Sequence, residues 1–399
     1  MKMEKFKPKQ QIGVGGFIFG PKEKKHINEV IKSNRLSYGP MSQKFEMQFA
    51  QAHECQYGIF CNSGTSALDM AIAALKEKYK WNKGDEVILP AITFIATSNM
   101  VLKNDLLPVF VDVDRKTYNI NPALIEKHVN NKTKAIIPVH LFGMPADMSP
   151  IVKISRKYNL RIIEDSCETM FACYKGKKVG SFGDIGCFST YIAHFLVTGI
   201  GGLCTTNNRD TAVILRSLMN HGRDSIYISI DDDKKKNSKR FFRVVDRRFK
   251  FIRLGHSFRA TELEAAIGLG QLENIGNIIL KRQKNARYLT EGLNGLAEIL
   301  QLPEIPSDRD HNFMMYPIVE KTGRKKELIY FLESNLIETR DLMPLLNQPV
   351  YEKLFGKIED KYPVAKWLNK NAFYIGCHQY LKKAELDYVI EKFHEFYKK

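Results

Sequence analysis

Short apolar runs alternate with longer amphipathic segments from residue 57 onward, and this alternation limits the possible folds more than any other feature of the chain. Buried strands are predicted at 85–90, 107–112, 135–142 and 160–163, with helices between them at 63–78, 95–103 and 147–157. Strands that are apolar along their whole length need cover on both faces of their sheet. The pattern therefore predicts an α/β fold with a mainly parallel central sheet between helices.

The length of the chain predicts two domains. With 399 residues it exceeds the size at which one hydrophobic core usually stops growing. We expect a larger α/β domain over 1–255 and a smaller α+β domain over 256–399. Further helices are predicted at 23–31, 44–52, 210–220, 260–272, 325–334 and 383–397.

Composition excludes several classes of protein. No apolar run approaches the roughly 18–20 residues of a transmembrane helix. The basic N-terminus lacks the apolar segment of a signal peptide, so a cytoplasmic location is expected. Seven cysteines without a C-x-x-C pair argue against a disulfide framework or a structural zinc site. The formal net charge of +17 suits nucleic acid, an acidic membrane surface or a phosphorylated substrate equally well.

The most basic stretch, 231–253, has two interpretations. Its charges are typical of a solvated surface loop, which is the interpretation we favour. Four aromatic residues interleave with the charges, as in surfaces that bind polyanions: Phe241, Phe242, Phe249 and Phe251. A regular amphipathic helix follows at once and no DNA-binding element is evident. Neither a nucleic acid nor a membrane is therefore an expected partner.

Three segments carry residues suited to a charged, planar ligand. Residues 62–67 (NSGTSA) precede a helix, where free backbone N–H groups and hydroxyls bind phosphate, although serine and threonine are also ordinary N-caps. Phe94 follows a strand, and its ring can stack on a planar group or lie in the core. Asp165 ends a buried strand, and a buried carboxylate needs a positive partner.

Two further segments carry a resemblance to a known family. The stretches CFSTYIAHFLVTGIGGLCTT (187–206) and LGHSFRATELEAAIG (254–268) resemble signatures of the DegT/DnrJ/EryC1/StrS family, pyridoxal-phosphate enzymes of unusual-sugar biosynthesis. Matches to the family run in consistent order from about residue 35 to 385. The resemblance implies a fold-type I, aspartate aminotransferase-like transferase fold, with the cofactor in the larger domain.

The resemblance also implies a set of cofactor contacts spread along the chain: Gly64, Thr65, Ser66, Phe94, Asp165, Glu168, Ser189 and Ser257. Residues 64–66 and Ser189 match phosphate ligands, Phe94 matches an aromatic over the ring, and Asp165 matches the partner of the pyridine nitrogen. Glu168 replaces a glutamine or histidine. Ser257 replaces an asparagine that reaches the phosphate in the neighbouring subunit. Tyr38 and Arg340 are expected near the substrate.

His194 stands where aminotransferases of the family have the lysine that forms a Schiff base with the cofactor. Ser189, five residues earlier, and the TGIGG turn at 198–202 fix this alignment. An imidazole forms no lasting Schiff base, but it accepts and donates protons near neutral pH. The substitution resembles the nucleotide-sugar 3-dehydratases of the family, which hold pyridoxamine phosphate without a covalent link.

That resemblance implies an enzyme that removes the C3 hydroxyl of a nucleotide-linked 4-keto-6-deoxy sugar, with His194 as acid and base. Glutamate would regenerate the pyridoxamine form, and two subunits would share the active sites of a homodimer. No iron–sulfur cluster is expected, because the closely spaced cysteines of the cluster-containing branch are missing. Two alternatives stay open: an atypical or mutated aminotransferase, and a non-catalytic cofactor-binding or regulatory homologue. The sequence identifies neither the sugar nor the nucleotide.

Overall fold

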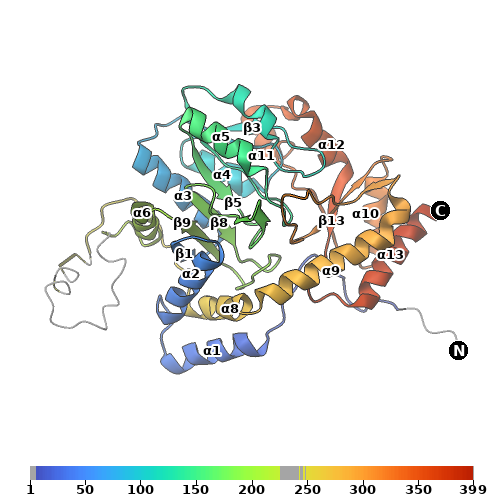
Figure 1. Ribbon diagram of the computed structural model, residues 1–399, viewed down its shortest axis with the longest axis horizontal. Helices are drawn as coiled ribbons and strands as arrows, with labels where there is room; N and C mark the ends of the chain where they lie inside the picture. The colour runs from blue at the N-terminus through green and yellow to red at the C-terminus, as the bar shows by residue number, and fades with distance from the viewer. Residues whose placement is uncertain (1–5, 225–241, 243–245, 248, 399) are drawn as a thin grey trace.

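The computed structural model describes residues 6–224, 242, 246, 247 and 249–398, and a seven-stranded sheet forms its centre (Figure 1). The strand order is β1-β9-β8-β5-β4-β2-β3. The strands are β1 (Tyr57–Cys61), β2 (Glu86–Pro90), β3 (Leu107–Val111), β4 (Thr133–Ile136), β5 (Arg161–Asp165), β8 (Ile185–Ser189) and β9 (Gly202–Thr206). Within this sheet, β9 pairs antiparallel with β1 and β8, and the other neighbouring strands pair in parallel. The predicted mainly parallel α/β sheet is confirmed.

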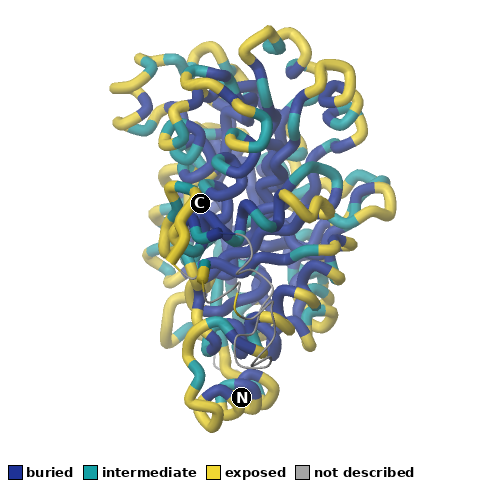
Figure 2. Tube along the Cα trace, turned by 90° about the vertical axis from the view of Figure 1, so that its left-hand side faces the viewer, coloured by how far each residue is buried: buried dark blue, intermediate teal, exposed yellow. Residues whose placement is uncertain are grey.

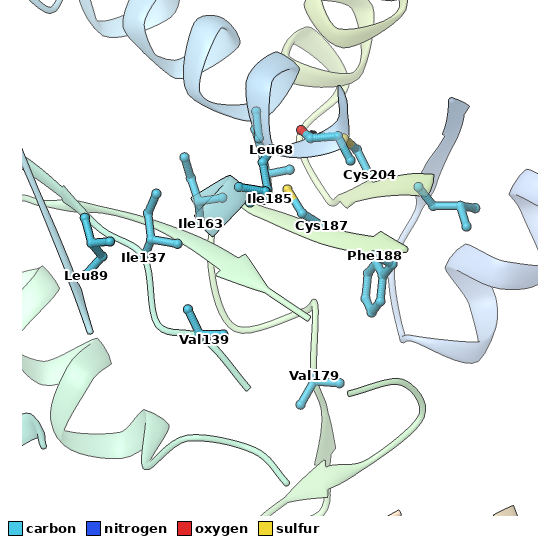
Figure 3. Close-up of a cluster of buried hydrophobic side chains, with 14 of the residues drawn as sticks. Leu68, Leu89, Ile137, Val139, Ile163, Val179, Ile185, Cys187, Phe188 and Cys204 are labelled. Carbon is cyan, nitrogen blue, oxygen red and sulfur yellow. Dashed lines mark hydrogen bonds between the residues drawn. The ribbon is translucent and has the colours of Figure 1, made fainter. Parts of the chain in front are cut away.

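Both faces of this sheet are buried, as the apolar strands predict. Val87 and Leu89 of β2 belong to one apolar core, while Ile88 between them belongs to another. The first core includes α3 (Gly64–Tyr79), and Figure 3 shows its Leu68 beside residues of β5, β8 and β9. The helices of this sheet are α3, α4 (Ile95–Lys103), α5 (Met148–Tyr158) and α6 (Arg209–Met219). Because side chains alternate along a strand, one apolar run supplies both cores.

The predicted strand 135–142 is wrong beyond Ile136, where β4 already ends. Pro138 follows, and proline has no N–H group to donate to a neighbouring strand. The chain then turns at Phe142, whose φ of 57° lies in the left-handed region. On the way, the N–H of His140 donates to the carbonyl of Asp165 (2.9 Å). The segment 137–142 thus crosses the end of β5 and comes to line the site described below.

A second, antiparallel sheet has the order β10-β11-β13-β12. It comprises β10 (Leu300–Gln301), β11 (Tyr316–Glu320), β12 (Thr339–Asp341) and β13 (Ala372–Ile375). It packs with α9 (Ile275–Leu293), α10 (Lys325–Ser334) and α13 (Lys383–Lys398) around a separate apolar core. Helices α10 and α13 were predicted. The long α9, α11 (Pro349–Phe355) and α12 (Pro363–Asn371) were not.

The N-terminal helices α1 (Pro21–Ser33) and α2 (Pro40–Ala52) pack against α8 (Glu262–Leu272) at the lower edge of the view in Figure 1. Helix α8 therefore lies with the start of the chain, and the division at residue 255 stays a prediction. The short elements are β6 (Cys173–Tyr174), β7 (Lys177–Lys178), η1 (Pro122–Leu124), η2 (Glu126–His128), η4 (Asn294–Leu296) and η5 (Glu359–Lys361).

Buried residues run through the middle of the molecule and exposed ones lie mainly in its peripheral turns and outer helix faces (Figure 2). Within the described ranges, no helix is long and apolar enough to cross a membrane. Most of the basic stretch 231–253, including Phe241, lies outside the described residues. Phe242, Phe249 and Phe251 are described and exposed, with the Phe249 side chain 82% exposed. The two interpretations of this stretch stay predictions.

Candidate functional site

A cavity of about 600 Å³ is lined by residues of both sheets. From the larger sheet it receives Asp165 at the end of β5 and Ser189 at the end of β8, together with the first residues of α3. From the smaller sheet it receives Arg340 of β12 and Tyr374 of β13. The carboxyl ends of parallel strands are where α/β sheets usually bind their ligands.

The start of α3 provides an anion-binding end to the cavity. Ser63 caps the helix by accepting the N–H of Ser66 (3.0 Å), which leaves the N–H groups of Gly64 and Thr65 without an intrahelical acceptor. The Ser189 side chain lies directly against Gly64: a Cβ atom at residue 64 would be 2.6 Å from that of Ser189. Glycine is therefore required there, and the close approach puts a hydroxyl beside the helix N-terminus, where an anion is stabilised.

Asp165 places a carboxylate in the cavity. It is 4% exposed, and its Oδ2 accepts a hydrogen bond from the Thr97 hydroxyl (2.7 Å). Its Oδ1 accepts the N–H of Cys167 at 3.2 Å. The Thr97 hydroxyl in turn lies 2.8 Å from that of Thr93, one helical turn earlier. The aspartate is thus held in one orientation by α4 and by its own turn.

Glu168 is a second buried carboxyl group in the cavity, near Asp165. Burial raises the pKa of Glu168 to about 8, and the nearby Asp165 charge adds to the increase. The N–H of Phe142 donates to its Oε2 (3.1 Å) and opposes that shift. The carboxyl group is therefore mostly neutral at pH 7 and can donate a hydrogen bond into the cavity.

His194 lies in the loop between β8 and β9 and lines the cavity. Its N–H donates to the carbonyl of Tyr191 (2.9 Å), and its carbonyl accepts from Arg282 (3.2 Å). Burial lowers the pKa of His194 to about 4, with a further lowering from the Arg282 charge. The imidazole is therefore neutral at pH 7. Its Nδ1 is buried without a hydrogen-bond partner in the described part of the chain.

Two apolar side chains offer contact surface for a flat ligand. Phe94, the residue before α4, lines the cavity and keeps 57% of its surface exposed. Val139, from the segment that crosses the end of β5, lines the cavity as well. A large aromatic side chain that is half exposed at a cavity is available to stack on a planar ring.

The other end of the cavity is formed by β12 and the N-terminal segment. Arg340 forms an ion pair with Glu338 and donates to the carbonyl of Thr339 (2.8 Å). Glu338 also accepts the N–H of Val14 (2.7 Å), which brings Val14 and Gly15 to the cavity wall. A guanidinium thus faces the space in which a negatively charged substrate can lie.

The model of the DegT/DnrJ/EryC1/StrS aminotransferase family matches residues 18–394, nearly the whole chain. The chain belongs to this family. Its relatives include the lipopolysaccharide biosynthesis protein RfbH of Salmonella typhimurium, which is 34% identical over 96% of this chain and 91% of that protein. They also include the GDP-perosamine synthase of Escherichia coli O157:H7, 34% identical over 94% of this chain and 96% of that enzyme.

A solved structure with the same fold is the E. coli GDP-4-keto-6-deoxy-D-mannose-3-dehydratase with bound hydrated PLP. It aligns with a TM-score of 0.85 and 28% identity over 96% of this chain and 99% of that chain. The predicted family and fold are confirmed. The family thus contains both dehydratases and enzymes named as perosamine synthases, and the solved relative contains the cofactor that the sequence predicts here.

The residues of the cavity fit that cofactor. Its phosphate needs hydrogen-bond donors, which the start of α3 and Ser189 provide, and its pyridine nitrogen needs a carboxylate, which Asp165 provides. The unpartnered Nδ1 of His194 also needs a ligand or water to satisfy it. No lysine lines the cavity in the described part of the chain. A covalent anchor of the usual kind is therefore missing from these walls.

The structure brings together most of the residues that the sequence singled out. Those that line the cavity are Gly64, Thr65, Phe94, Asp165, Glu168, Ser189, His194 and Arg340. Ser66 lies just behind it, where its hydroxyl donates to Asn62 (2.7 Å). Tyr38 lies outside the cavity and donates to Glu46 (2.8 Å). Ser257 also lies outside, with its hydroxyl accepting from Arg259 (2.9 Å).

Sequence reasoning missed several residues of the site. Thr97 supports Asp165, and Tyr374 comes from β13 of the smaller sheet. Glu338 directly precedes β12, and Val14 comes from a segment far away in the chain. Thr97 lies on the predicted helix 95–103, and Thr93 precedes that helix, so the spacing of four residues between two hydroxyls was the available signal. Nothing in the local sequence around Tyr374 or Val14 indicates the contact.

Proposed function

We propose that this protein is a pyridoxamine-phosphate-dependent 3-dehydratase that acts on a nucleotide-linked 4-keto-6-deoxy sugar. One observation carries the proposal: His194, which the sequence resemblance aligns with the family's anchoring lysine, lines the cavity, and no lysine lines it in the described ranges. A transaminase needs that amine both to hold the cofactor and to move a proton. The names of the dehydratase relatives support the same reaction.

Different residues of the cavity would bind different parts of the cofactor. The amides of Gly64 and Thr65 and the Ser189 hydroxyl would bind its phosphate, Asp165 would pair with its pyridine nitrogen, and Phe94 would cover its ring. When bound, the cofactor supplies an amine for the keto carbon and a conjugated ring that takes up an electron pair. Neutral Glu168 would donate a hydrogen bond to an acceptor on the ring.

His194 would move the proton. Because its pKa is lowered to about 4, it is a free base at neutral pH and accepts a proton from the carbon beside the amine. The imidazolium formed would then donate a proton to the departing C3 hydroxyl, which leaves as water. Arg340 would bind an anionic part of the substrate from the opposite wall.

The stoichiometry of the net reaction provides an assay for the proposed function. Replacing the C3 hydroxyl by hydrogen takes two electrons, which glutamate supplies, so each deoxygenated sugar should yield one 2-oxoglutarate and one ammonia. We expect these products in equal amounts from GDP-4-keto-6-deoxymannose or its dTDP and CDP counterparts with glutamate and pyridoxal phosphate. Release of 2-oxoglutarate without ammonia, with a stable 4-amino sugar, would contradict the proposal.

Transamination is the second candidate, and the 34% identity to a GDP-perosamine synthase favours it. The same assay separates the two, because an aminotransferase leaves the glutamate nitrogen on the sugar. Glutamate labelled with ¹⁵N should give labelled ammonia from a dehydratase and a labelled sugar from an aminotransferase. Absence of both products with every sugar nucleotide would favour the non-catalytic homologue.

A homodimer completes the proposal. The monomer's own Ser257 lies outside its cavity, as expected for a residue that reaches the phosphate in a second copy. Light scattering of the purified protein should give twice the chain mass of 45.9 kDa. A monomer that binds pyridoxal phosphate with full affinity would contradict the shared site.

A further inference from the structure

Arg282 is a fully buried arginine directly behind the cavity. It lies on α9, is 0% exposed and donates three hydrogen bonds, all to backbone carbonyls. Its Nη2 donates to the carbonyl of His194 (3.2 Å), and its Nη1 donates to those of Met314 (2.8 Å) and Phe313 (3.3 Å). Because both Met314 and His194 line the cavity, one side chain connects two of its walls.

The charge of Arg282 has no carboxylate partner in the described part of the chain. The charged or ionisable groups that act on it are Cys377 and Tyr380, and its Nε is buried without a hydrogen-bond acceptor. The Phe195 ring, with its centroid 5.0 Å from Cζ, covers one side. Burial lowers the pKa of Arg282 to about 10, so it still carries its proton at pH 7. A buried arginine normally has an acidic partner, so this arrangement is unusual.

We propose that Arg282 is a positioning residue for His194: its hydrogen bonds connect the His194 peptide to the backbone of 313–314, and its buried charge adds to the effect of burial in keeping the imidazole in the neutral, proton-accepting form. The inference rests on the proposed function, because a neutral imidazole is needed if His194 takes up a proton. Arg282 would thus influence the protonation state of His194 although Arg282 itself does not line the cavity.

Burial is the main cause of the lowered pKa of His194, and Arg282 is the one charged side chain that adds to it within the described residues. The charged and titratable side chains on the surrounding elements are Asp165, Cys167, Glu168, Tyr191, Glu338, Arg340, Tyr374 and His378. A negative charge among them would favour the protonated imidazole, and the positive Arg340 is paired with Glu338. The pKa of His378, which is also near Arg282, is lowered to about 4 by burial and by the same guanidinium. One unpaired cation thus acts on two buried histidines.

The test is a titration of His194 in the cofactor-free protein. Histidines labelled with ¹³C at Cε1 are followed by NMR, and the signal absent from His194→Asn assigns that residue. Arg282→Met removes the charge at similar length, Arg282→Lys keeps it, and Arg287→Met removes one charge from the exposed face of the same helix as a matched control. We expect the His194 pKa to rise by about one pH unit in Arg282→Met and to stay unchanged in the other two.

Catalysis gives a second readout. With pyridoxal phosphate and glutamate, the acid limb of the pH–rate profile should move up with the NMR value in Arg282→Met, whereas Arg282→Lys should lose rate without moving it. An unchanged His194 pKa in Arg282→Met, or an equal change in Arg287→Met, would overturn the proposal. If Arg282→Met does not fold, Arg282→Gln takes its place, and failure of both would make Arg282 a purely structural residue. A shifted pKa without sugar turnover would remove the proposed function and leave this inference standing.

Discussion

Two sets of one histidine and one carboxylate lie near the end of β5: His140 is bonded to Glu164, whereas His194 and Asp165 both line the cavity. The two sets differ in how many of their polar atoms have a hydrogen-bond partner within the protein. Behind the sheet, Glu164 is 0% exposed and accepts the Nε2–H of His140 (3.2 Å). It also accepts three backbone N–H groups, those of Gly180, Phe182 and Gly183. In the cavity, the carboxylate of Asp165 accepts two hydrogen bonds, and Nδ1 of His194 has no partner, as far as the described residues show.

Glu164 and Asp165 show that two acids adjacent in the sequence can have different roles. Glu164 and Asp165 point to opposite faces because side chains alternate along a strand. Nδ1 of His140 accepts the N–H of Ala146 (2.9 Å), so both ring nitrogens of this histidine have hydrogen-bond partners. His140 and Glu164 have their hydrogen bonds satisfied within the protein, and we infer that their role is structural. The His194–Asp165 group keeps capacity for a ligand, and the predictions below test that distinction.

The largest effect is expected from the two histidines. His194→Asn should reduce sugar turnover by about 10³-fold, because an amide cannot transfer the proton, while the melting temperature changes little. His140→Asn should lower the free energy of unfolding by about 1–3 kcal/mol, because it leaves buried partners unpaired, with turnover per folded molecule retained. Steady-state kinetics and thermal melts measure both. Equal loss of turnover in the two variants would break the comparison.

Substitutions of the two acids should likewise differ in effect, with Asp165 affecting turnover and Glu164 affecting stability. Asp165→Asn should reduce turnover by about 10²-fold, because an amide would replace the carboxylate that we propose pairs with the pyridine nitrogen. Glu164→Gln should destabilise the fold by about 2–4 kcal/mol, because the amide nitrogen would face backbone N–H donors. Urea denaturation and kinetics at saturating cofactor are the measurements. The distinction fails if Glu164→Gln loses turnover while its stability is unchanged.

Glu168 provides a pH-dependent test within the cavity. Its pKa is raised from 4.5 to about 8, so the folded protein holds a proton that the unfolded chain has lost over that range. Its contribution to stability is therefore complete below pH 4.5 and is lost as the pH rises through 8. In the cofactor-free protein, Glu168→Gln should remove this loss, which is on the order of a few kcal/mol. Parallel stability curves for the two proteins would contradict the assignment.

The smallest effect is expected at Thr97, which supports Asp165 from α4. Thr97→Val keeps the shape of the side chain and removes one hydrogen bond to the carboxylate, worth about 1 kcal/mol. Turnover should fall by roughly fivefold, with a smaller decrease in Thr93→Val, which contacts Asp165 only through Thr97. An effect as large as that of Asp165→Asn would mean that Thr97 itself touches the ligand.

The sequence predicts the larger sheet well because its signals are local. Apolar runs and amphipathic spacing placed β2, β3 and β5 within a few residues of their observed bounds. The predicted strand 135–142 was wrong beyond Ile136, because Pro138 and the left-handed Phe142 end the pairing early. The antiparallel β9 and the helix α9 were missed, since strand direction and a helix on a second core depend on contacts distant in the chain.

The residues of the site differ in the same way: those with local sequence signals could be predicted, and those placed by contacts distant in the chain could not. The residues at strand ends and at the start of α3 could be predicted, because the turn after each strand carries its own sequence pattern. Glu338, Tyr374 and Val14 reach the cavity through the packing of the smaller sheet and the N-terminal segment. Arg282 was not singled out, because an arginine on an amphipathic helix ordinarily faces solvent. Its role depends on full burial, which composition does not indicate.

The most direct test of the central claim is chemical trapping at His194. The protein is incubated with pyridoxal phosphate, reduced with borohydride and analysed by peptide mass spectrometry, with His194→Lys as the matched control. We predict a stoichiometric phosphopyridoxyl adduct on residue 194 of the His194→Lys protein and no stoichiometric lysine adduct in the natural chain. A stoichiometric adduct on a lysine of the natural chain would contradict the account, because it would show a covalent anchor that the described cavity walls lack.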